Sequence, residues 1–319
     1  MEFTIRSIGT GLIRMLWITA MCLLLVASCL AKSNENPEAT GTEADGDCIS
    51  KTGLHCEIYG RGEPLLCLHG LGGSIYSWRE LKKSPELQKY QLILIDMRGA
   101  GDSPKPHDKH YSTPEQADLI YEFILEKDLK NLTLIGNSYG GAVSLLVAIK
   151  LGEQAPERLS RLILIDSGGY NWKLPRHLRI LRTPVLGWLA LHLRSPEKNV
   201  RTILHDSYYD KTKVTQPQIA EYARPIGLLR GRYALLQMAK QVIPKNIDEI
   251  VCKYQNIRVP TLILWGERDK IIPLEVGERL HSAIRSSVLE IIPKAGHVPQ
   301  EEQPGETIRH IVRFLDAHP

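Results

Sequence analysis

The chain has 319 residues, of which 43% are hydrophobic and 24% charged, and its formal net charge is +4. This length permits one large domain or two modest ones. A nucleic-acid-binding protein is not indicated, because no run of basic residues is interleaved with aromatic side chains. No spacing of cysteines suggests a metal site, and we expect neither a metal nor another cofactor.

Residues 1–29 differ in character from the rest of the chain. Arg6 and Arg14 precede an apolar stretch over 15–26, which is short for a spanning helix, and small residues then lead to Cys29. This pattern predicts a secretory signal, and the Val-Ala-Ser-Cys at its end resembles a bacterial lipobox. The resemblance implies cleavage before Cys29, lipid attachment to its thiol and anchoring of the mature chain to a membrane. Plain secretion and an uncleaved signal anchor are the alternatives, and all three predict export from a bacterial cytosol.

Residues 30–47 are expected to form a flexible tether, because they contain almost nothing that could be buried. Cys48 and Cys56 then flank a predicted Thr52-Gly53 turn. They would lie on facing strands of a hairpin and could form a disulfide in an oxidising compartment. A two-residue turn would place them one residue out of direct opposition, which leaves the disulfide open.

Short apolar runs alternate with helical patterns through most of the remaining chain. Such runs are typical of strands covered on both faces. They occupy residues 64–68, 92–95, 132–135, 162–165, 261–265 and 288–292. The alternation predicts an α/β fold with a mostly parallel, twisted sheet flanked by helices. Ligands of such sheets bind at the carboxyl ends of the strands.

Residues 168–257 interrupt this alternation and would be inserted into a core formed by 48–167 and 258–319. Their pattern is helical, and prolines break it into short pieces: Pro175, Pro184, Pro196, Pro217 and Pro225. We expect a helical cap over the carboxyl edge of the sheet. The cap holds fifteen Lys and Arg against six Asp and Glu. This excess could attract an anionic substrate or membrane surface, or could belong to solvated helix faces.

The sequence Gly-Asn-Ser-Tyr-Gly-Gly at 136–141 lies between a predicted strand and a predicted helix. A serine at the apex of a strand, turn and helix, with a glycine two residues to either side, is the pattern of a nucleophile elbow. The glycines let strand and helix pass closely, while a strained serine backbone directs Oγ into a cleft. Ser138 is therefore our candidate nucleophile.

A serine nucleophile needs a base that accepts its proton and an acid that orients the base. His297 follows the last predicted strand in a Gly-His-x-Pro setting and is our candidate base. Asp269 follows the preceding strand and is our candidate acid. Asp166, just after another strand, competes with Asp269 for this role, and Glu267 competes more weakly.

The oxyanion that develops during attack needs N–H donors placed in advance. We expect the backbone N–H groups of Leu71 and Tyr139 to supply them. His69 is predicted to hold the Leu71 loop by hydrogen bonds rather than to carry protons. Residues 96–103 are interpreted as a hydrogen-bonded turn at a strand end, not as a phosphate or metal site.

Residues 48–316 resemble the α/β-hydrolase superfamily throughout. The shared motifs are His-Gly-Leu-Gly-Gly at 69–73, Asp-x-Arg-Gly-x-Gly-x-Ser at 96–103, Gly-Asn-Ser-Tyr-Gly-Gly at 136–141, Gly-Glu-Arg-Asp at 266–269 and Gly-His-x-Pro at 296–299. The resemblance implies the α/β-hydrolase fold and a triad in the chain order Ser138, Asp269, His297. Serine at the elbow argues against the epoxide-hydrolase and haloalkane-dehalogenase branches, which the resemblance associates with aspartate. The Gly-Asn-Ser-x-Gly-Gly form is also similar to carbon–carbon bond hydrolases of aromatic degradation, which are typically cytosolic and have anionic substrates.

These features predict a serine hydrolase, with a carboxylesterase or lipase-like enzyme acting on a small acyl substrate as the leading hypothesis. A carbon–carbon bond hydrolase of the meta-cleavage type with the same triad is one alternative. A non-catalytic binding protein on the same fold is the other. We expect no nucleic-acid partner, and a membrane contact through the N-terminal lipid or anchor. The candidate pocket walls are Leu71, Tyr139, Trp188, Tyr233 and Trp265.

Overall fold

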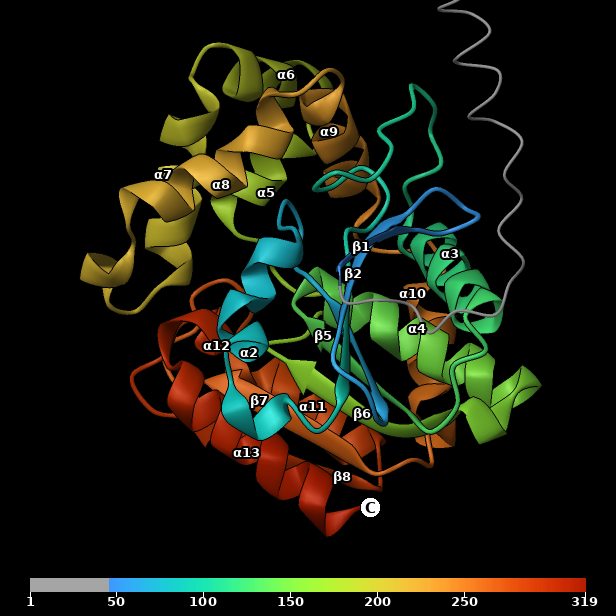
Figure 1. Ribbon diagram of the computed structural model, residues 1–319. Coiled ribbons are helices and arrows are strands. Elements are labelled where there is room, and N and C mark those ends of the chain that lie inside the picture. The colour runs from blue at the N-terminus through green and yellow to red at the C-terminus, as the bar shows by residue number, and fades with distance from the viewer. Residues whose placement is uncertain (1–45) are drawn as a thin grey trace, which may run out of the picture. The chain divides into compact units, whose positions relative to one another are not determined.

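The computed structural model describes residues 46–319 (Figure 1). The predictions for the signal segment, for Cys29 and for nearly all of the 30–47 tether lie outside these residues. Within 46–319, no helix combines the length and the apolar character that crossing a membrane requires.

The described residues form an eight-stranded sheet with the order β1-β2-β4-β3-β5-β6-β7-β8. Strands β3 to β8 are parallel to one another, and the antiparallel hairpin β1–β2 joins them through β4. The strands are Gly46–Ile49 (β1), His55–Tyr59 (β2), Pro64–Leu68 (β3), Gln91–Ile95 (β4), Leu132–Asn137 (β5), Leu159–Ile165 (β6), Thr261–Gly266 (β7) and Ser287–Ile292 (β8). The predicted mostly parallel sheet is confirmed, and each predicted apolar run forms a strand.

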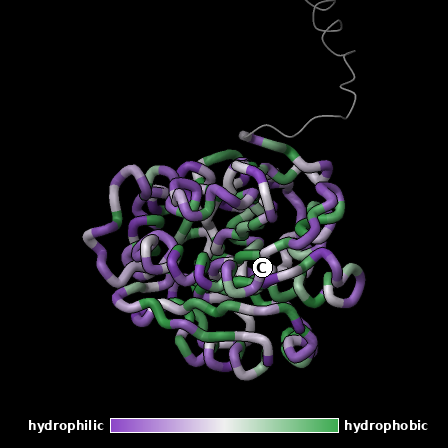
Figure 2. The backbone as a smooth tube through the Cα atoms, turned by 60° about the horizontal axis from the view of Figure 1, so that its bottom comes forward, coloured by the Kyte–Doolittle hydropathy of each residue, from purple (hydrophilic) through white to green (hydrophobic). Residues whose placement is uncertain are grey.

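Helices cover both faces of this sheet, which explains why its central strands, β3 to β7, are mainly apolar and buried. Alternate residues of a strand point to opposite faces, so Leu66 of β3 packs in one apolar cluster and Leu65 in another. One face is covered by α3 (Thr113–Glu126), α4 (Tyr139–Gln154) and α11 (Leu274–Ala283). The other is covered by the 3-10 turn η1 (Ile75–Trp78), α2 (Arg79–Lys82) and α13 (Pro304–Ala317). The changes of hydropathy along the backbone can be followed in Figure 2.

The β1–β2 hairpin corrects one expectation. Cys48 lies directly opposite Cys56, not one residue away, and the two form a disulfide with their Cα atoms 4.9 Å apart. The reason is that the loop has three residues, 51–53, instead of two. Gly53 ends it with φ of +81°, the left-handed conformation that closes a three-residue hairpin loop.

Residues between β6 and β7 form six α-helices: α5 (Arg176–Leu181), α6 (Pro184–His192), α7 (Pro196–Ser207), α8 (Gln216–Gly227), α9 (Gly231–Gln241) and α10 (Ile247–Cys252). Figure 1 shows α5 to α9 as a group beyond one edge of the sheet. Side chains from α6 to α9 share an apolar cluster of their own, whereas α10 packs Ile250 into the cluster of the core. Pro184, Pro196 and Pro217 stand in the first turns of helices, where proline costs no hydrogen bond. Pro225 lies inside α8 and does not end it.

Candidate active site

Ser138 lies between β5 and α4 in a conformation that few residues adopt. Its φ is +56° and its ψ is −115°, which is strained for a residue with a side chain. Three hydrogen bonds hold the backbone there. The N–H of Ser138 donates to the Ile165 carbonyl, while its own carbonyl accepts from Ala142 and Gly168. The predicted elbow geometry is present.

The two glycines that flank the elbow are required by close contacts. A Cβ at Gly136 would lie 2.4 Å from the carbonyl oxygen of Gly140, and a Cβ at Gly140 would lie 2.1 Å from that of Leu68. Real side chains do not tolerate such distances to backbone atoms. Glycine at both positions therefore lets β5, α4 and β3 approach one another closely.

The structure brings Ser138, His297 and Asp269 together although they are far apart in the chain. Ser138 Oγ lies 2.8 Å from His297 Nε2, and His297 Nδ1 lies 2.7 Å from Asp269 Oδ2. Asp269 Oδ1 accepts hydrogen bonds from the N–H groups of Ile271 and Ile272. The side chains of His297 and Asp269 are both buried, with 7% and 1% of their surface exposed. This arrangement allows the imidazole to accept the hydroxyl proton while a fixed carboxylate faces its other nitrogen.

The competing acids occupy different environments. Asp166 is buried, and its Oδ1 accepts a hydrogen bond from the N–H of Gly266. One oxygen of Asp166, one of Asp269 and a ring nitrogen of His297 all lie within 4.8 Å of one another. Burial and the charge of Asp269 raise the pKa of Asp166 well above its ordinary value, which favours its protonated form. Glu267 is exposed and accepts from the N–H of Lys294, away from His297.

The loop after β3 lies against the serine. A Cβ at Gly70 would lie 3.3 Å from Ser138 Cβ. The N–H of Met97, which follows β4, donates to His69 Nε2 in this loop. The proton on the ring is therefore at Nδ1 and donates to the Gly70 carbonyl. Burial lowers the pKa of His69 and keeps the ring neutral. His69 thus holds the loop, as predicted, and Leu71 and Tyr139 both line the cavity beside Ser138.

Ser138 and His297 open on a cavity of about 300 Å³ between the sheet and the helices inserted after β6. Its lining is mainly apolar, and Arg194 is the one Arg or Lys among the lining residues that the structure describes. Two of the candidate walls, Leu71 and Tyr139, line this cavity, but the other three do not. Trp265 is fully buried in the core and Trp188 is 52% exposed on α6, while Tyr233 donates to the Asp108 carbonyl elsewhere. Residue size alone misidentified these three, because the lining depends on how the inserted helices pack.

The loop that carries His297 is held from two sides by residues that the sequence did not single out. Asn137, next to the serine, donates its side-chain amide to the His297 carbonyl. On the cap side, the N–H of His297 donates to the Ser207 carbonyl at 2.6 Å. Glu302 accepts from the N–H of Gly296 and from the N–H groups of 209 and 210, at the end of α7. The helices after β6 therefore help to place the imidazole.

Glu301 closes a buried hydrogen-bond network between the core and the cap. Its side chain is 0% exposed. It accepts from Arg79 of the core and from Tyr208, Gln218 and Tyr222 of the cap. Burial and the Glu301 carboxylate hold the pKa of Tyr222 well above its ordinary value, so its hydroxyl remains a donor.

The variant Glu301→Ala is expected to lower the free energy of unfolding by about 3–5 kcal/mol, because it leaves a largely buried guanidinium and three donors without their acceptor. Urea denaturation at neutral pH measures this change. Glu221→Ala is the matched control, since the Glu221 side chain is 49% exposed and lies 3.9 Å from Arg224. It should cost less than about 1 kcal/mol. Similar losses in the two variants would contradict the assigned role of Glu301.

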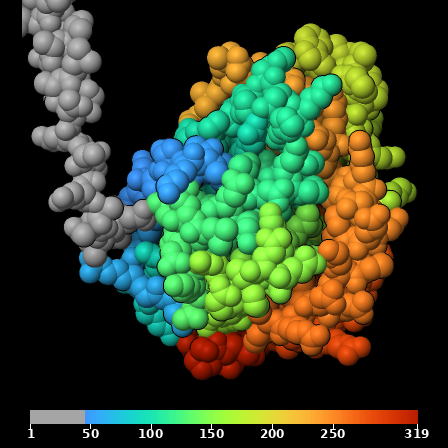
Figure 3. All heavy atoms as spheres, turned by 90° about the vertical axis from the view of Figure 1, so that its right-hand side faces the viewer, coloured from blue at the N-terminus to red at the C-terminus, as the bar shows by residue number. Residues whose placement is uncertain are grey.

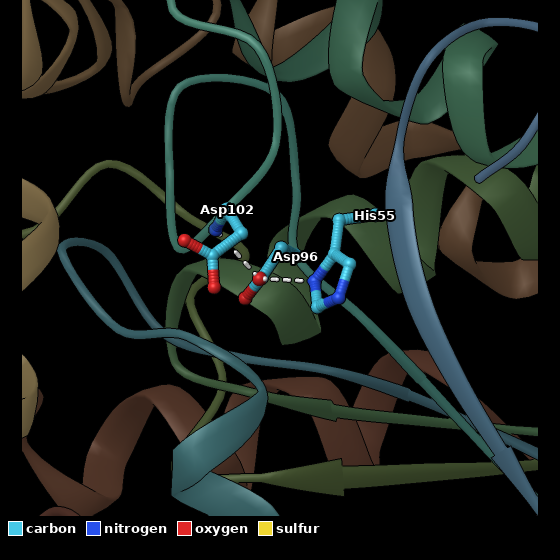
Figure 4. A group of neighbouring side chains, drawn as sticks. All are labelled: His55, Asp96 and Asp102. Atoms are coloured by element: carbon cyan, nitrogen blue, oxygen red, sulfur yellow. Dashed lines mark hydrogen bonds and ion pairs between the residues drawn. The ribbon is translucent and has the colours of Figure 1, made fainter. Parts of the chain in front are cut away.

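A second group of polar side chains surrounds Asp96, at the end of β4. Figure 4 shows Asp96 between His55 and Asp102. Asp96 accepts from His55 Nδ1 at 2.8 Å and from the N–H groups of Ile75 and Asp102. Asp102 in turn accepts hydrogen bonds from Nη1 and Nη2 of Arg224, on α8 of the cap. Because these carboxylate oxygens already accept hydrogen bonds, we assign the group a structural role, in agreement with the predicted turn.

The His55–Asp96 pair predicts a pH dependence of stability. The hydrogen bond to Asp96 raises the pKa of His55 above its ordinary value, so this stabilisation is fully present below about pH 6.5 and is lost as pH rises through the higher, folded-state pKa. Urea denaturation of wild type should show a larger loss between about pH 6 and about pH 9 than that of His55→Asn. His110→Asn, at a side chain 70% exposed, should behave as wild type. Equal losses in wild type and His55→Asn would contradict the prediction.

Comparisons of the sequence and of the structure with known proteins point to the same family. Residues 63–304 match the family model described as alpha/beta hydrolase fold. Over 273 residues, the chain is 30% identical to 2-hydroxy-6-oxo-2,4-heptadienoate hydrolase from Pseudomonas putida, with 84% of this chain and 93% of the relative covered. Lipase 3 from a Moraxella species is 28% identical, with 80% and 78% covered. Among solved structures, a meta-cleavage product hydrolase from Pseudomonas fluorescens has a TM-score of 0.71 at 23% identity, with 86% and 99% covered.

Proposed function

Because the chain belongs to the alpha/beta hydrolase fold family, we propose that it is a serine hydrolase that cleaves carboxylic esters through an acyl-enzyme on Ser138. One observation carries the proposal. Ser138 Oγ, His297 and Asp269 are joined by contacts of 2.8 and 2.7 Å, and the serine opens on a mainly apolar cavity.

In the first half of the reaction, His297 Nε2 takes the hydroxyl proton as Ser138 Oγ attacks the ester carbonyl. The N–H groups of Leu71 and Tyr139 stabilise the oxyanion, and removing one such donor typically costs about 3–4 kcal/mol. The N–H of Tyr139 is available because it is in the first turn of α4 and has no partner within the helix. The tetrahedral intermediate expels the alcohol, which receives its proton from His297. Water then repeats the sequence on the acyl-enzyme and releases the carboxylic acid.

The cavity favours an ester with an apolar acyl group. Residues from the cap helices, among them Leu178 of α5, Leu191 of α6 and Ile203 of α7, line it together with residues of the core. Burying an acyl chain there gains about 0.8 kcal/mol per methylene group. We therefore infer that residues 168–257 act as a substrate-binding cap.

A carbon–carbon bond hydrolase is the second candidate, and the 30% identity to a heptadienoate hydrolase favours it. Its substrate would carry a carboxylate, and Arg194 is the lining cation that could bind it. Ser138, His297 and Asp269 would act again. The carbon–carbon bond would break after water or Ser138 Oγ has added to the neighbouring carbonyl. The mainly apolar lining makes this the weaker of the two proposals.

The test combines covalent labelling with substrate choice. The folded chain is treated with a fluorophosphonate probe and the labelled peptide is mapped. Turnover is then compared between p-nitrophenyl esters of increasing acyl length and a vinylogous diketone. Labelling at Ser138 with ester turnover supports the esterase, and the best chain length gives the depth of the cavity. Labelling with turnover of the diketone alone supports the carbon–carbon hydrolase, and absence of labelling would support a binding protein.

We also propose that the chain is exported and held at a membrane by lipid on Cys29. The signal-like sequence of 1–29 supports this proposal, as does the Cys48–Cys56 disulfide, which is typical of oxidising compartments. Cells that express the chain are grown with labelled palmitate. Incorporation should be lost in Cys29→Ala and kept in Cys252→Ala, a change at an exposed free cysteine. Incorporation that survives Cys29→Ala would contradict the proposal.

A further inference from the structure

Exposed apolar side chains concentrate on and just after helix α6. Eleven large hydrophobic residues are exposed within the described part of the chain, and four of them lie between 185 and 193. These are Val185, Leu186, Trp188 and Leu193, with 68%, 54%, 52% and 76% of their surface exposed. Gly187 and Leu191 are buried on the opposite side of the helix. The outer side of α6 is thus an apolar surface that no other described element covers.

Basic side chains flank this surface on both sides. Residues 173–198 contain six Arg or Lys and one acidic residue, Glu197. The basic residues are Lys173, Arg176, Arg179, Arg182, Arg194 and Lys198. The ion pairs described among the cap helices involve other residues, His177, Arg224 and Lys253, so these six charges are not neutralised by pairing within 46–319. Arg194 also lines the cavity, so we call Val185, Leu186, Trp188, Leu193 and the other five basic residues the α6 surface.

The α6 surface lies at an outer end of the molecule. In Figure 1, α6 is at the far side of the cap from α13, and in Figure 3 the yellow-green atoms of this part of the chain form an upper corner opposite the red C-terminal residues. The inner side of the same helix reaches the cavity, where Ala190 and Leu191 belong to the lining. A partner on the α6 surface would therefore be separated from the cavity by one helix.

The positive charge of the α6 surface indicates which kind of partner binds there. A second copy of this chain in a two-fold contact would place the same basic residues against one another, which is unfavourable. An anionic bilayer supplies negative headgroups for the basic residues and an apolar layer for tryptophan, leucine and valine. That combination is characteristic of helices that lie in a membrane interface.

We propose that the α6 surface docks the catalytic unit onto a membrane that contains anionic lipid, with Trp188 and its apolar neighbours entering the interface. This places the cavity next to the bilayer, so an apolar ester could pass from lipid to Ser138 without crossing bulk water. The inference depends on neither the proposed chemistry nor a lipid on Cys29. Its test therefore measures binding and uses the full chain with Ser138→Ala, so that a failure of docking and a failure of the proposed function can be told apart.

The readout is quenching of Trp188 by brominated acyl chains. Vesicles are made either from phosphatidylcholine alone or from an equimolar mixture with phosphatidylglycerol, each with brominated lipid. The fluorescence of the same chain with Trp188→Phe is subtracted, which leaves the contribution of Trp188 alone. We expect Trp188 to be quenched on the anionic vesicles and to be quenched little on the neutral ones. Equal quenching on both, or none on either, would overturn the proposal.

Two pairs of variants test whether docking depends on the α6 surface or only on the general attraction between a basic protein and an anionic membrane. Arg176→Ser with Arg179→Ser should reduce the equilibrium constant for docking about 25-fold, because each basic residue near an anionic surface contributes about 1 kcal/mol. Arg258→Ser with Arg285→Ser is the matched control. Both are exposed and precede β7 and β8, at the opposite edge of the sheet from the cap, and this pair should leave quenching unchanged. Equal effects of the two pairs would overturn the proposal, as would a self-association in solution that Leu193→Ser abolishes.

Discussion

Replacing Ser138 by alanine is expected to reduce kcat/KM for ester hydrolysis by about 10⁶-fold, the size of loss that follows removal of a serine nucleophile in a triad. In the proposed reaction Oγ is the atom that bonds to the acyl carbon, and alanine would leave His297 without a group to deprotonate. The cavity and the N–H donors remain, so a small rate above that of water should persist. The measurement is the hydrolysis of the best p-nitrophenyl ester under subsaturating conditions.

The change should leave the fold intact, because alanine and serine meet similar strain at a positive φ. Ser144→Ala provides the matched control. Ser144 is buried in α4, the helix that follows Ser138, and its hydroxyl donates to the Gly140 carbonyl. It touches no group of the proposed reaction, so kcat/KM should change by less than about tenfold. Comparable losses in the two variants would show that packing around α4, not nucleophilic attack, determines the rate.

Asp269→Asn is expected to reduce kcat by about 10⁴-fold with little change in KM. Asp269 accepts from His297 Nδ1 in the structure, which leaves Nε2 free to take the serine proton. The amide of asparagine can donate to Nδ1 instead, and the ring would then carry its proton on Nε2. That tautomer cannot act as the base, so the loss should appear in the chemical step.

The variant Asp166→Asn tests whether the neighbouring acid, Asp166, shares the role of Asp269 in orienting His297. Burial and the charge of Asp269 raise the pKa of Asp166 and so favour its neutral form. A neutral amide of the same shape should therefore replace it with a loss of less than about tenfold in kcat. Steady-state kinetics on both variants checks the pair. If Asp166→Asn were the more damaging change, the acid of the triad would have to be reassigned.

Much of the sheet and of the site could be predicted because both follow local patterns. A strand covered on both faces must be mainly apolar, and this is why the runs at 64–68 and 132–135 identify β3 and β5. The carboxyl ends of parallel strands meet at one edge, so Ser138, Asp269 and His297 could be grouped from their positions after three different strands.

The features that escaped prediction depend on contacts between distant segments. Glu301 bonds to Gln218 and Tyr222, about 80 residues earlier in the chain, and nothing around Glu301 in the sequence indicates those partners. The register of the Cys48–Cys56 hairpin was missed because Thr52-Gly53 fits a two-residue turn as well as the end of a three-residue loop. Trp188 was misplaced because hydrophobicity does not distinguish the cavity side of a short helix from its outer side.

The attachment of the histidine loop to the end of α7 limits how this protein could acquire new specificities. The N–H of His297 meets the Ser207 carbonyl, and Glu302 meets the N–H groups of 209 and 210. A cap transplanted from a relative would have to present one carbonyl and two N–H groups at these same places, or the imidazole would lose its support. Successful chimeras should therefore keep 207–210 with the core. Divergence by recombination is thus confined to cap segments on either side of this connection.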